Sequence, residues 1–93
     1  MKEHLNILVI DDDEADLMVV RRLFEKTKLK VSIEEASDCK DGVEKLKTQN
    51  FDCAIIDYHL PDAKGVEVID QLREVDGKEI PLIVLTGVGS ATM

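Results

Sequence analysis

Short runs of apolar residues alternate along the chain with longer amphipathic stretches, a pattern that predicts strands alternating with helices. Buried strands are expected at residues 5–10, 54–56 and 82–85, where apolar and β-branched side chains follow one another. Between the first two, Val31 and Ile33 alternate with Ser32 and Glu34. That alternation predicts an edge strand with one solvent-facing side.

Between these strands, apolar residues recur at the spacing of one helix face. In a helix over about residues 14–26 the stripe is Leu17, Val20 and Phe24, with Leu23 beside them. A short second helix, capped by Ser37 or Asp38, carries Val43 and Leu46, and Phe51 closes it against the core. A third helix begins near Gly65 and places four residues at core spacing: Val66, Ile69, Leu72 and Val75.

Strands that alternate with helices imply right-handed crossovers and a parallel sheet. The first strand is expected to be buried and the second to lie at an edge. These two expectations favour the order 2-1-3-4 of a flavodoxin-like, doubly wound α/β sheet. In that order the first and third strands are neighbours.

Both of these neighbouring strands end in carboxylates: Asp11 and Asp12 follow the first, and Asp57 ends the third. The carboxyl ends of adjacent parallel strands lie side by side, so the three side chains are expected to converge on one pocket. Two unit charges about 4 Å apart repel by about 4 kcal/mol at an effective dielectric near 20. Such a cluster takes up protons or binds a cation, and oxygen ligands suit Mg²⁺.

Composition narrows the class of protein and of partner. A chain of 93 residues that is 44% hydrophobic is expected to form one small globular domain. The net charge of −8 argues against nucleic acid or an anionic membrane as a direct partner. The N-terminus leads within a few residues into a strand, which leaves no room for a signal peptide, and no apolar stretch approaches membrane-spanning length. A cytoplasmic location is therefore expected. Cys39 and Cys53 are too few and too far apart for a disulfide scaffold or a zinc site.

Taken together, the motifs resemble the receiver domain of two-component response regulators over essentially the whole chain. Besides the three aspartates, the features that follow the family pattern are Asp41-Gly42, Leu60-Pro61, Gly65 and the Thr86-Gly87 pair. No single feature is specific, but their order and intervals are.

The resemblance implies a role for each site residue. Mg²⁺ would be held by Asp12 and Asp57, with Asp11 acting mainly through a bound water and the backbone carbonyl of His59 as a further ligand. Asp57 would accept a phosphoryl group, and Thr86 would contact that group. The donor would be a sensor histidine kinase or a phosphotransfer protein. Such a module is not an enzyme beyond its own phosphorylation and dephosphorylation.

The sequence departs from the family pattern at its C-terminal end. A receiver continues with a fourth helix, a fifth strand that carries a lysine, and a last helix, whereas this sequence ends at Met93. Residues 1–93 are therefore expected to form a single receiver domain that is incomplete at the C-terminus and lacks the fifth strand and last helix. Lys78 precedes the fourth strand and cannot replace the lysine. The open fourth strand favours a homodimer, formed by strand-edge pairing or by C-terminal exchange.

Two other functions stay open at this point. One is a degenerate receiver that acts only in protein interaction or dimerisation. The other is a haloacid-dehalogenase-like phosphatase, whose D-x-D spacing Asp11 and Asp13 satisfy, although Ala15 stands where that family has Thr or Val.

Several polar residues near the site have plainer interpretations. Asp13 and Glu14 are expected to be a helix cap and a first-turn charge rather than metal ligands. Asp62 is expected to be a loop residue and Lys64 a surface residue. The side chain of His59 is expected to tune the access of water or a partner.

Overall fold

Strands and helices alternate in the structure, a computed structural model that describes residues 4–58, 60–63, 65–74 and 80–85. In chain order the elements are β1 (His4–Ile10), α1 (Glu14–Glu25), β2 (Lys30–Ala36), α2 (Cys39–Thr48), β3 (Cys53–Asp57), α3 (Gly65–Arg73) and β4 (Leu82–Leu85). Every element predicted from the sequence is present. Within the described residues, no helix has the length and apolar character needed to cross a membrane.

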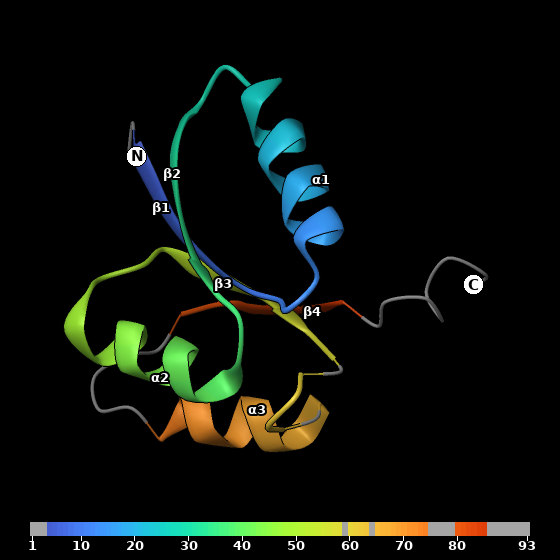
Figure 1. The fold of residues 1–93 in the computed structure, drawn as a ribbon. Coiled ribbons are helices and arrows are strands. Elements are labelled where there is room, and N and C mark those ends of the chain that lie inside the picture. The colour runs from blue at the N-terminus through green and yellow to red at the C-terminus, as the bar shows by residue number, and fades with distance from the viewer. Residues whose placement is uncertain (1–3, 59, 64, 75–79, 86–93) are drawn as a thin grey trace.

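The strands form one parallel sheet in the order β2-β1-β3-β4, which confirms the predicted topology (Figure 1). β1 and β3 are apolar on both sides and take the central positions, as buried parallel strands do. Their register pairs Ile10 with Ile56. The next residues along the two strands, Asp11 and Asp57, therefore reach the same edge of the sheet.

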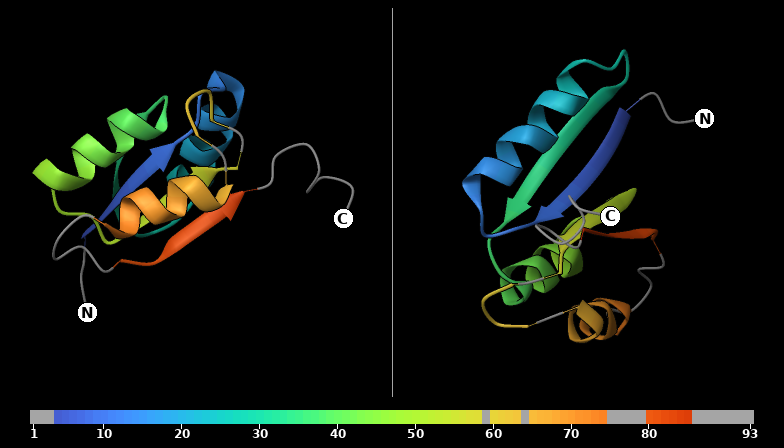
Figure 2. Two further views of the ribbon diagram at one scale, coloured as in Figure 1. Left: turned by 90° about the horizontal axis from the view of Figure 1, so that it is seen from below. Right: turned by 90° about the vertical axis from the view of Figure 1, so that its right-hand side faces the viewer.

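Helices cover the two sheet faces unequally: α1 lies on one face, and α2 and α3 lie on the other (Figure 2). The larger core, between the sheet and α2 and α3, contains Leu8, Ile10, Ala36, Cys39, Leu46, Phe51, Ala54, Ile56, Leu60, Ala63, Val68 and Leu72. The smaller core, under α1, contains Ile7, Val9, Leu17 and Val20.

Gly42 explains how α2 approaches the sheet. A Cβ atom at this position would lie 2.3 Å from Cδ1 of Ile10 on β1, closer than such atoms ever pack. Glycine therefore costs the helix some propensity but allows α2 to lie directly against the central strand. The helix begins after Asp38, whose carboxylate accepts a hydrogen bond from the Asp41 amide at 2.7 Å. Of the two predicted caps, Asp38 is the one used.

Two helix faces differ from the prediction. Leu23 does not join the buried stripe of α1, because its side chain points to solvent and is 60% exposed. In α3 the fully buried residues are Val68 and Leu72, four positions apart, and Ile69 is only partly buried. The predicted spacing of three residues drifts around a helix with 3.6 residues per turn, which is why it missed Val68. The side chain of Val66 and the whole of Val75 lie outside the described residues.

Candidate functional site

Three carboxylates meet where β1 and β3 end. Asp11, Asp12 and Asp57 each offer one oxygen atom, and these atoms all lie within 4.8 Å of one another. Asp11 is 3% exposed and Asp57 is 8% exposed, whereas Asp12 is exposed. The sheet register thus brings together the three side chains that the sequence placed at this edge.

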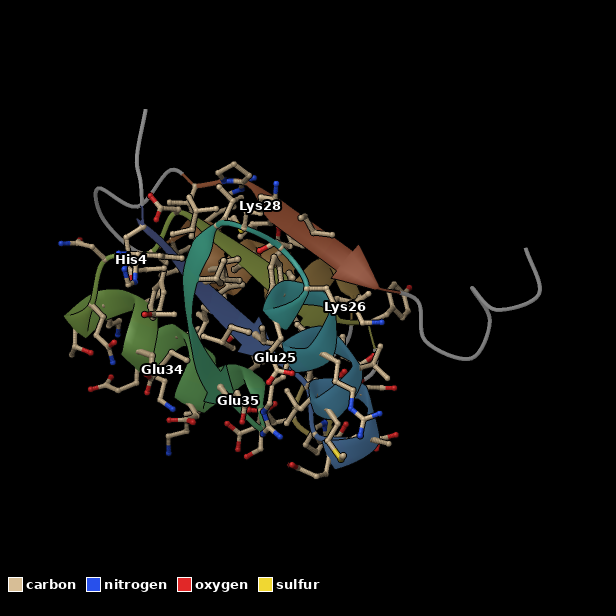
Figure 3. All side chains as sticks on the ribbon, turned by 90° about the horizontal axis from the view of Figure 1, so that it is seen from above. His4, Glu25, Lys26, Lys28, Glu34 and Glu35 are labelled. Carbon is tan, nitrogen blue, oxygen red and sulfur yellow. The ribbon has the colours of Figure 1, made fainter. Side chains whose placement is uncertain are left out.

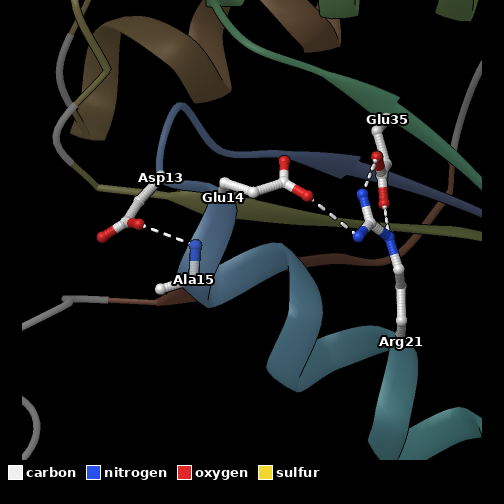
Figure 4. A network of polar contacts seen from close by, with 5 residues as sticks. All are labelled: Asp13, Glu14, Ala15, Arg21 and Glu35. Atoms are coloured by element: carbon white, nitrogen blue, oxygen red, sulfur yellow. Dashed lines mark hydrogen bonds and ion pairs between the residues drawn. The ribbon is translucent and has the colours of Figure 1, made fainter.

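The turn from β1 into α1 holds Asp11 in place. Its amide donates to the carbonyl of Ala36 at 2.9 Å, which extends the pairing of β1 with β2 by one residue. Its Oδ1 accepts a hydrogen bond from the amide of Asp13 at 2.9 Å. Asp13 in turn accepts from the amide of Ala15 at 2.9 Å and caps α1 (Figure 4). The interpretation of Asp13 as a helix cap is confirmed.

Burial and nearby negative charge change the proton affinity of Asp11. The pKa of Asp11 is raised to about 6, first by burial and then by the charges of Asp57 and Asp16, against the opposing effect of the hydrogen bond from the Asp13 amide. A buried carboxyl with like charges beside it gains most from a bound proton or cation. The cluster is therefore electrostatically strained as a set of bare anions.

Asp16 is a further acidic residue close to Asp11, and the sequence did not indicate its part in this site. It lies in the first turn of α1, and its charge is one of the causes that raise the pKa of Asp11. The available signal was its position: the third residue of a helix points back toward the helix start, and here that start is the end of β1.

The segment after Asp57 is fixed to the rest of the fold at several points. Leu60 and Ala63 are buried in the larger core, and the amide of Leu60 donates to the carbonyl of Ala63 at 3.2 Å. The carboxylate of Asp62 accepts hydrogen bonds from the amides of Cys39 at 2.8 Å and Lys40 at 3.0 Å, in the first turn of α2.

These contacts change the interpretation of Asp62. Burial raises the pKa of Asp62, but the hydrogen bonds from the Cys39 and Lys40 amides outweigh it and leave the pKa below its ordinary value. Asp62 is thus more than a loop residue: it connects the segment that follows Asp57 to α2. Nothing in the local sequence signals this contact, because the bonded residues are 23 positions apart.

Other residues singled out in the sequence cannot be placed. His59, Lys64, Lys78, Thr86 and Gly87 lie outside the described residues. The roles inferred for His59 and Thr86 therefore stay predictions.

Comparison with known proteins identifies the family. The profile of the response regulator receiver domain matches residues 7–93. This chain belongs to the response regulator receiver domain family. A curated relative, the transcriptional regulatory protein SrrA of Staphylococcus aureus (strain NCTC 8325 / PS 47), is 31% identical over 86 residues, which are 92% of this chain and 34% of that protein. The chain thus spans about a third of the length of the curated relatives it matches.

Solved receiver domains have the same fold. A CheY-like receiver domain from Methylobacillus flagellatus aligns with a TM-score of 0.75 at 22% identity, over 86% of this chain and 67% of that one. The receiver domain of Francisella response regulator 1452 aligns with a TM-score of 0.75 at 25% identity, over 92% and 71% of the two chains.

As a receiver domain, the chain is a module of two-component signal transduction rather than an enzyme with separate substrates. The match over residues 7–93 leaves no support for the haloacid-dehalogenase alternative.

Proposed function

We propose that this receiver domain takes a phosphoryl group onto Asp57 in a Mg²⁺-dependent reaction and relays the signal by a change of conformation. One observation carries the proposal: oxygens of Asp11, Asp12 and Asp57, from the ends of two adjacent strands, lie within 4.8 Å of one another. A carboxylate at the end of a buried strand is costly unless something compensates its charge.

The donor set fits a hard divalent cation. All three side chains offer oxygen, and the raised pKa of Asp11, caused first by burial, supports a cation that offsets the charge of the cluster. Asp11, Asp12 and Asp57 would hold Mg²⁺, with the backbone carbonyl of His59 as a further ligand. The bound ion would offset the repulsion between Asp57 and the incoming phosphoryl group.

The chain's own residues would act as follows. A carboxylate oxygen of Asp57 attacks the phosphorus of a phosphohistidine, an O–P bond forms and the P–N bond breaks. The electron pair of the broken bond stays on the imidazole nitrogen, and the product is an acyl phosphate on Asp57. The hydrogen bond from the Asp13 amide orients the carboxylate of Asp11. Thr86 donates its hydroxyl to a phosphoryl oxygen.

The partner that supplies the phosphoryl group is a sensor histidine kinase or a phosphotransfer protein in the cytoplasm. The net charge of −8 supports protein partners and disfavours direct contact with nucleic acid or an anionic membrane. A second copy of the chain is a further partner, paired through β4, because within the described residues β4 is bonded to β3 alone and carries the half-exposed Ile83.

Incubation with acetyl phosphate and Mg²⁺ tests the proposed reaction. We expect incorporation of phosphate that is stable to acid but released by hydroxylamine, and its loss in Asp57→Asn. Asp70→Asn makes the same change at an exposed position of α3 and is expected to label as the wild type does. Undiminished labelling of Asp57→Asn would contradict the assignment. A wild type that never labels would favour the alternative of a degenerate receiver that acts only through protein interaction.

A further inference from the structure

The first turn of α2 is capped twice, from two distant parts of the chain. Asp38, the residue before the helix, accepts from the Asp41 amide. Asp62, in the connection between β3 and α3, accepts from the amides of Cys39 and Lys40. The local cap follows the usual pattern of helix starts. The second carboxylate is available to α2 only because the segment after Asp57 folds back onto it.

The two kinds of contact that hold this segment differ in what they can fix. Leu60 and Ala63 keep it against the larger core, but apolar burial is nondirectional. The Asp62 carboxylate uses one oxygen for each amide, Oδ1 for Cys39 and Oδ2 for Lys40. Hydrogen bonds from two successive amides fix both the distance and the orientation of the segment relative to α2.

We propose that Asp62 is a positioning residue of the phosphoacceptor site: by tying the segment after β3 to α2, it holds Asp57 and the backbone that follows it in the geometry that binds Mg²⁺ and accepts the phosphoryl group. This inference rests on the proposed function. Only four residues separate Asp62 from Asp57, so freedom at one is transmitted to the other. Without the tether, metal binding must also order the segment, and the conformational entropy of that ordering weakens affinity.

Alanine substitution at each cap separates positioning from stability. Asp62→Ala removes the tether, whereas the matched control Asp38→Ala removes the other carboxylate cap of the same helix and leaves the segment after Asp57 untouched. Both variants are expected to melt at lower temperature than the wild type. Only Asp62→Ala is expected to weaken Mg²⁺ binding, by about 10-fold. Groups that orient metal ligands typically change affinity by about 10- to 100-fold, and we expect the low end of this range because Asp62 is exposed.

The protein carries a reporter for this titration. Tyr58, directly after Asp57, is its single tyrosine, and the chain has no tryptophan, so intrinsic fluorescence reports on the site. Affinities are compared at a temperature where circular dichroism shows every variant folded. The same variants are phosphorylated with acetyl phosphate, and Asp62→Ala is expected to react more slowly than Asp38→Ala.

A conservative variant separates the hydrogen bonds from the charge. Asp62→Asn loses the same charge as Asp62→Ala but keeps one acceptor oxygen for the α2 amides. We expect it to recover part of the lost Mg²⁺ affinity. Equal losses in the two variants would assign the effect to long-range charge and overturn the positioning role.

Amide resonances provide a signature that stability alone would not produce. In the wild type, Mg²⁺ is expected to shift the ¹⁵N–¹H signals of Cys39 and Lys40, because Asp62 links them to the site; in Asp62→Ala these shifts disappear. If the wild type binds Mg²⁺ but Asp62→Ala and Asp38→Ala bind it equally well, the positioning role is wrong and the proposed function stands. If the wild type shows no saturable Mg²⁺ binding, both are wrong.

Discussion

The two faces of the sheet differ in how completely they are covered. On the face of α2 and α3, sheet residues such as Leu8, Ile10 and Ile56 are fully buried. On the face of α1, Cys53 and Ile55 are only partly buried, and Ile83 of β4 is 48% exposed. The reason is the placement of the helices: α2 and α3 pack on one face of the sheet, and α1 packs on the other (Figure 2).

The two faces of the sheet therefore contribute unequally to stability. Burial of apolar surface contributes about 25 cal/mol per Å², so the larger core on the face of α2 and α3 contributes more hydrophobic stabilisation than the smaller core under α1. The carboxylate cluster lies at the sheet edge, and Asp62 connects the segment after Asp57 to the well-packed side. On the face of α1, the apolar side chain of Ile83 stays half-exposed.

The largest expected effect comes from adjacent residues of β3 that point to opposite faces. Ile56 is 1% exposed in the larger core, and Ile55 packs partly buried against the smaller one. Ile56→Ala is expected to lower the free energy of unfolding by about 2 to 5 kcal/mol, and Ile55→Ala by about half as much. Urea denaturation measures both.

Equal losses at the two positions would show that the faces contribute alike and would refute the comparison. If Ile56→Ala does not fold, the pair Ile56→Val and Ile55→Val tests the same order at about 0.5 to 1.5 kcal/mol.

The second largest expected loss of stability comes from Gly42, where α2 packs against β1. Gly42→Ala would place a Cβ 2.3 Å from Cδ1 of Ile10. Overpacking costs about 1 to 3 kcal/mol, and the higher helix propensity of alanine returns up to about 1 kcal/mol, so we expect a net loss of about 1 to 2 kcal/mol. Ile10→Val removes Cδ1, the nearer of the two Ile10 atoms that would clash, and leaves Cγ1 at 2.9 Å. The double variant should therefore lose less than the sum of the single variants, and strict additivity would mean that the contact is not the cause.

The fold was predictable because it depends on the burial pattern of a few short segments. β1 and β3 are apolar on both sides, β2 alternates, and these patterns were enough to give the strand order and the meeting of Asp11, Asp12 and Asp57. Contacts made by one polar side chain across a long sequence separation were not predictable. Asp62 looks like any exposed loop carboxylate until the fold brings the first turn of α2 beside it.

The position of a helix stripe was also uncertain at the level of single residues. Val68 and Ile69 are adjacent apolar residues of α3, and only the packing of the helix decides that Val68 is fully buried while Ile69 is partly buried. Leu23 is the reverse case, an apolar residue that was expected beside the buried stripe but is exposed. Its side chain points to solvent because α1 presents Leu17 and Val20 to the sheet instead.

Exposed apolar surface on the face of α1 predicts concentration-dependent self-association. Ile83→Lys places a charge where a second copy would cover an apolar side chain and is expected to weaken the dimer by about 10-fold, equivalent to about 1.4 kcal/mol. Light scattering over a wide concentration range measures this. Lys30→Ala, at the start of the opposite edge strand β2, is the control and should leave the monomer–dimer equilibrium unchanged. A wild type that stays monomeric at every concentration would contradict the proposed homodimer.

The smallest effect concerns the ion pairs that join the two faces around β2. Glu34 and Glu35 lie near the carboxyl end of this edge strand (Figure 3). Arg21 of α1 donates from two nitrogens to the carboxylate of Glu35 (Figure 4). On the other side, Nζ of Lys45 in α2 lies 3.6 Å from Oε1 of Glu34. The geometry on the α1 side is bidentate and therefore the stronger of the two.

Glu35→Gln should lower the melting temperature by roughly 1 to 3 °C at neutral pH, and Glu34→Gln by less, because exposed ion pairs contribute little. The hydrogen bond from Arg21 holds the pKa of Glu35 below its ordinary value of 4.5. A lowered folded-state pKa means that the pair stabilises the protein above the unfolded-state pKa and that this stabilisation is lost as the pH falls through the folded-state pKa. The difference between Glu35→Gln and the wild type should therefore shrink below about pH 4.5 and also at high salt. Thermal melts across pH measure it, and a difference that persists in acid would show that Glu35 stabilises the edge through packing rather than charge.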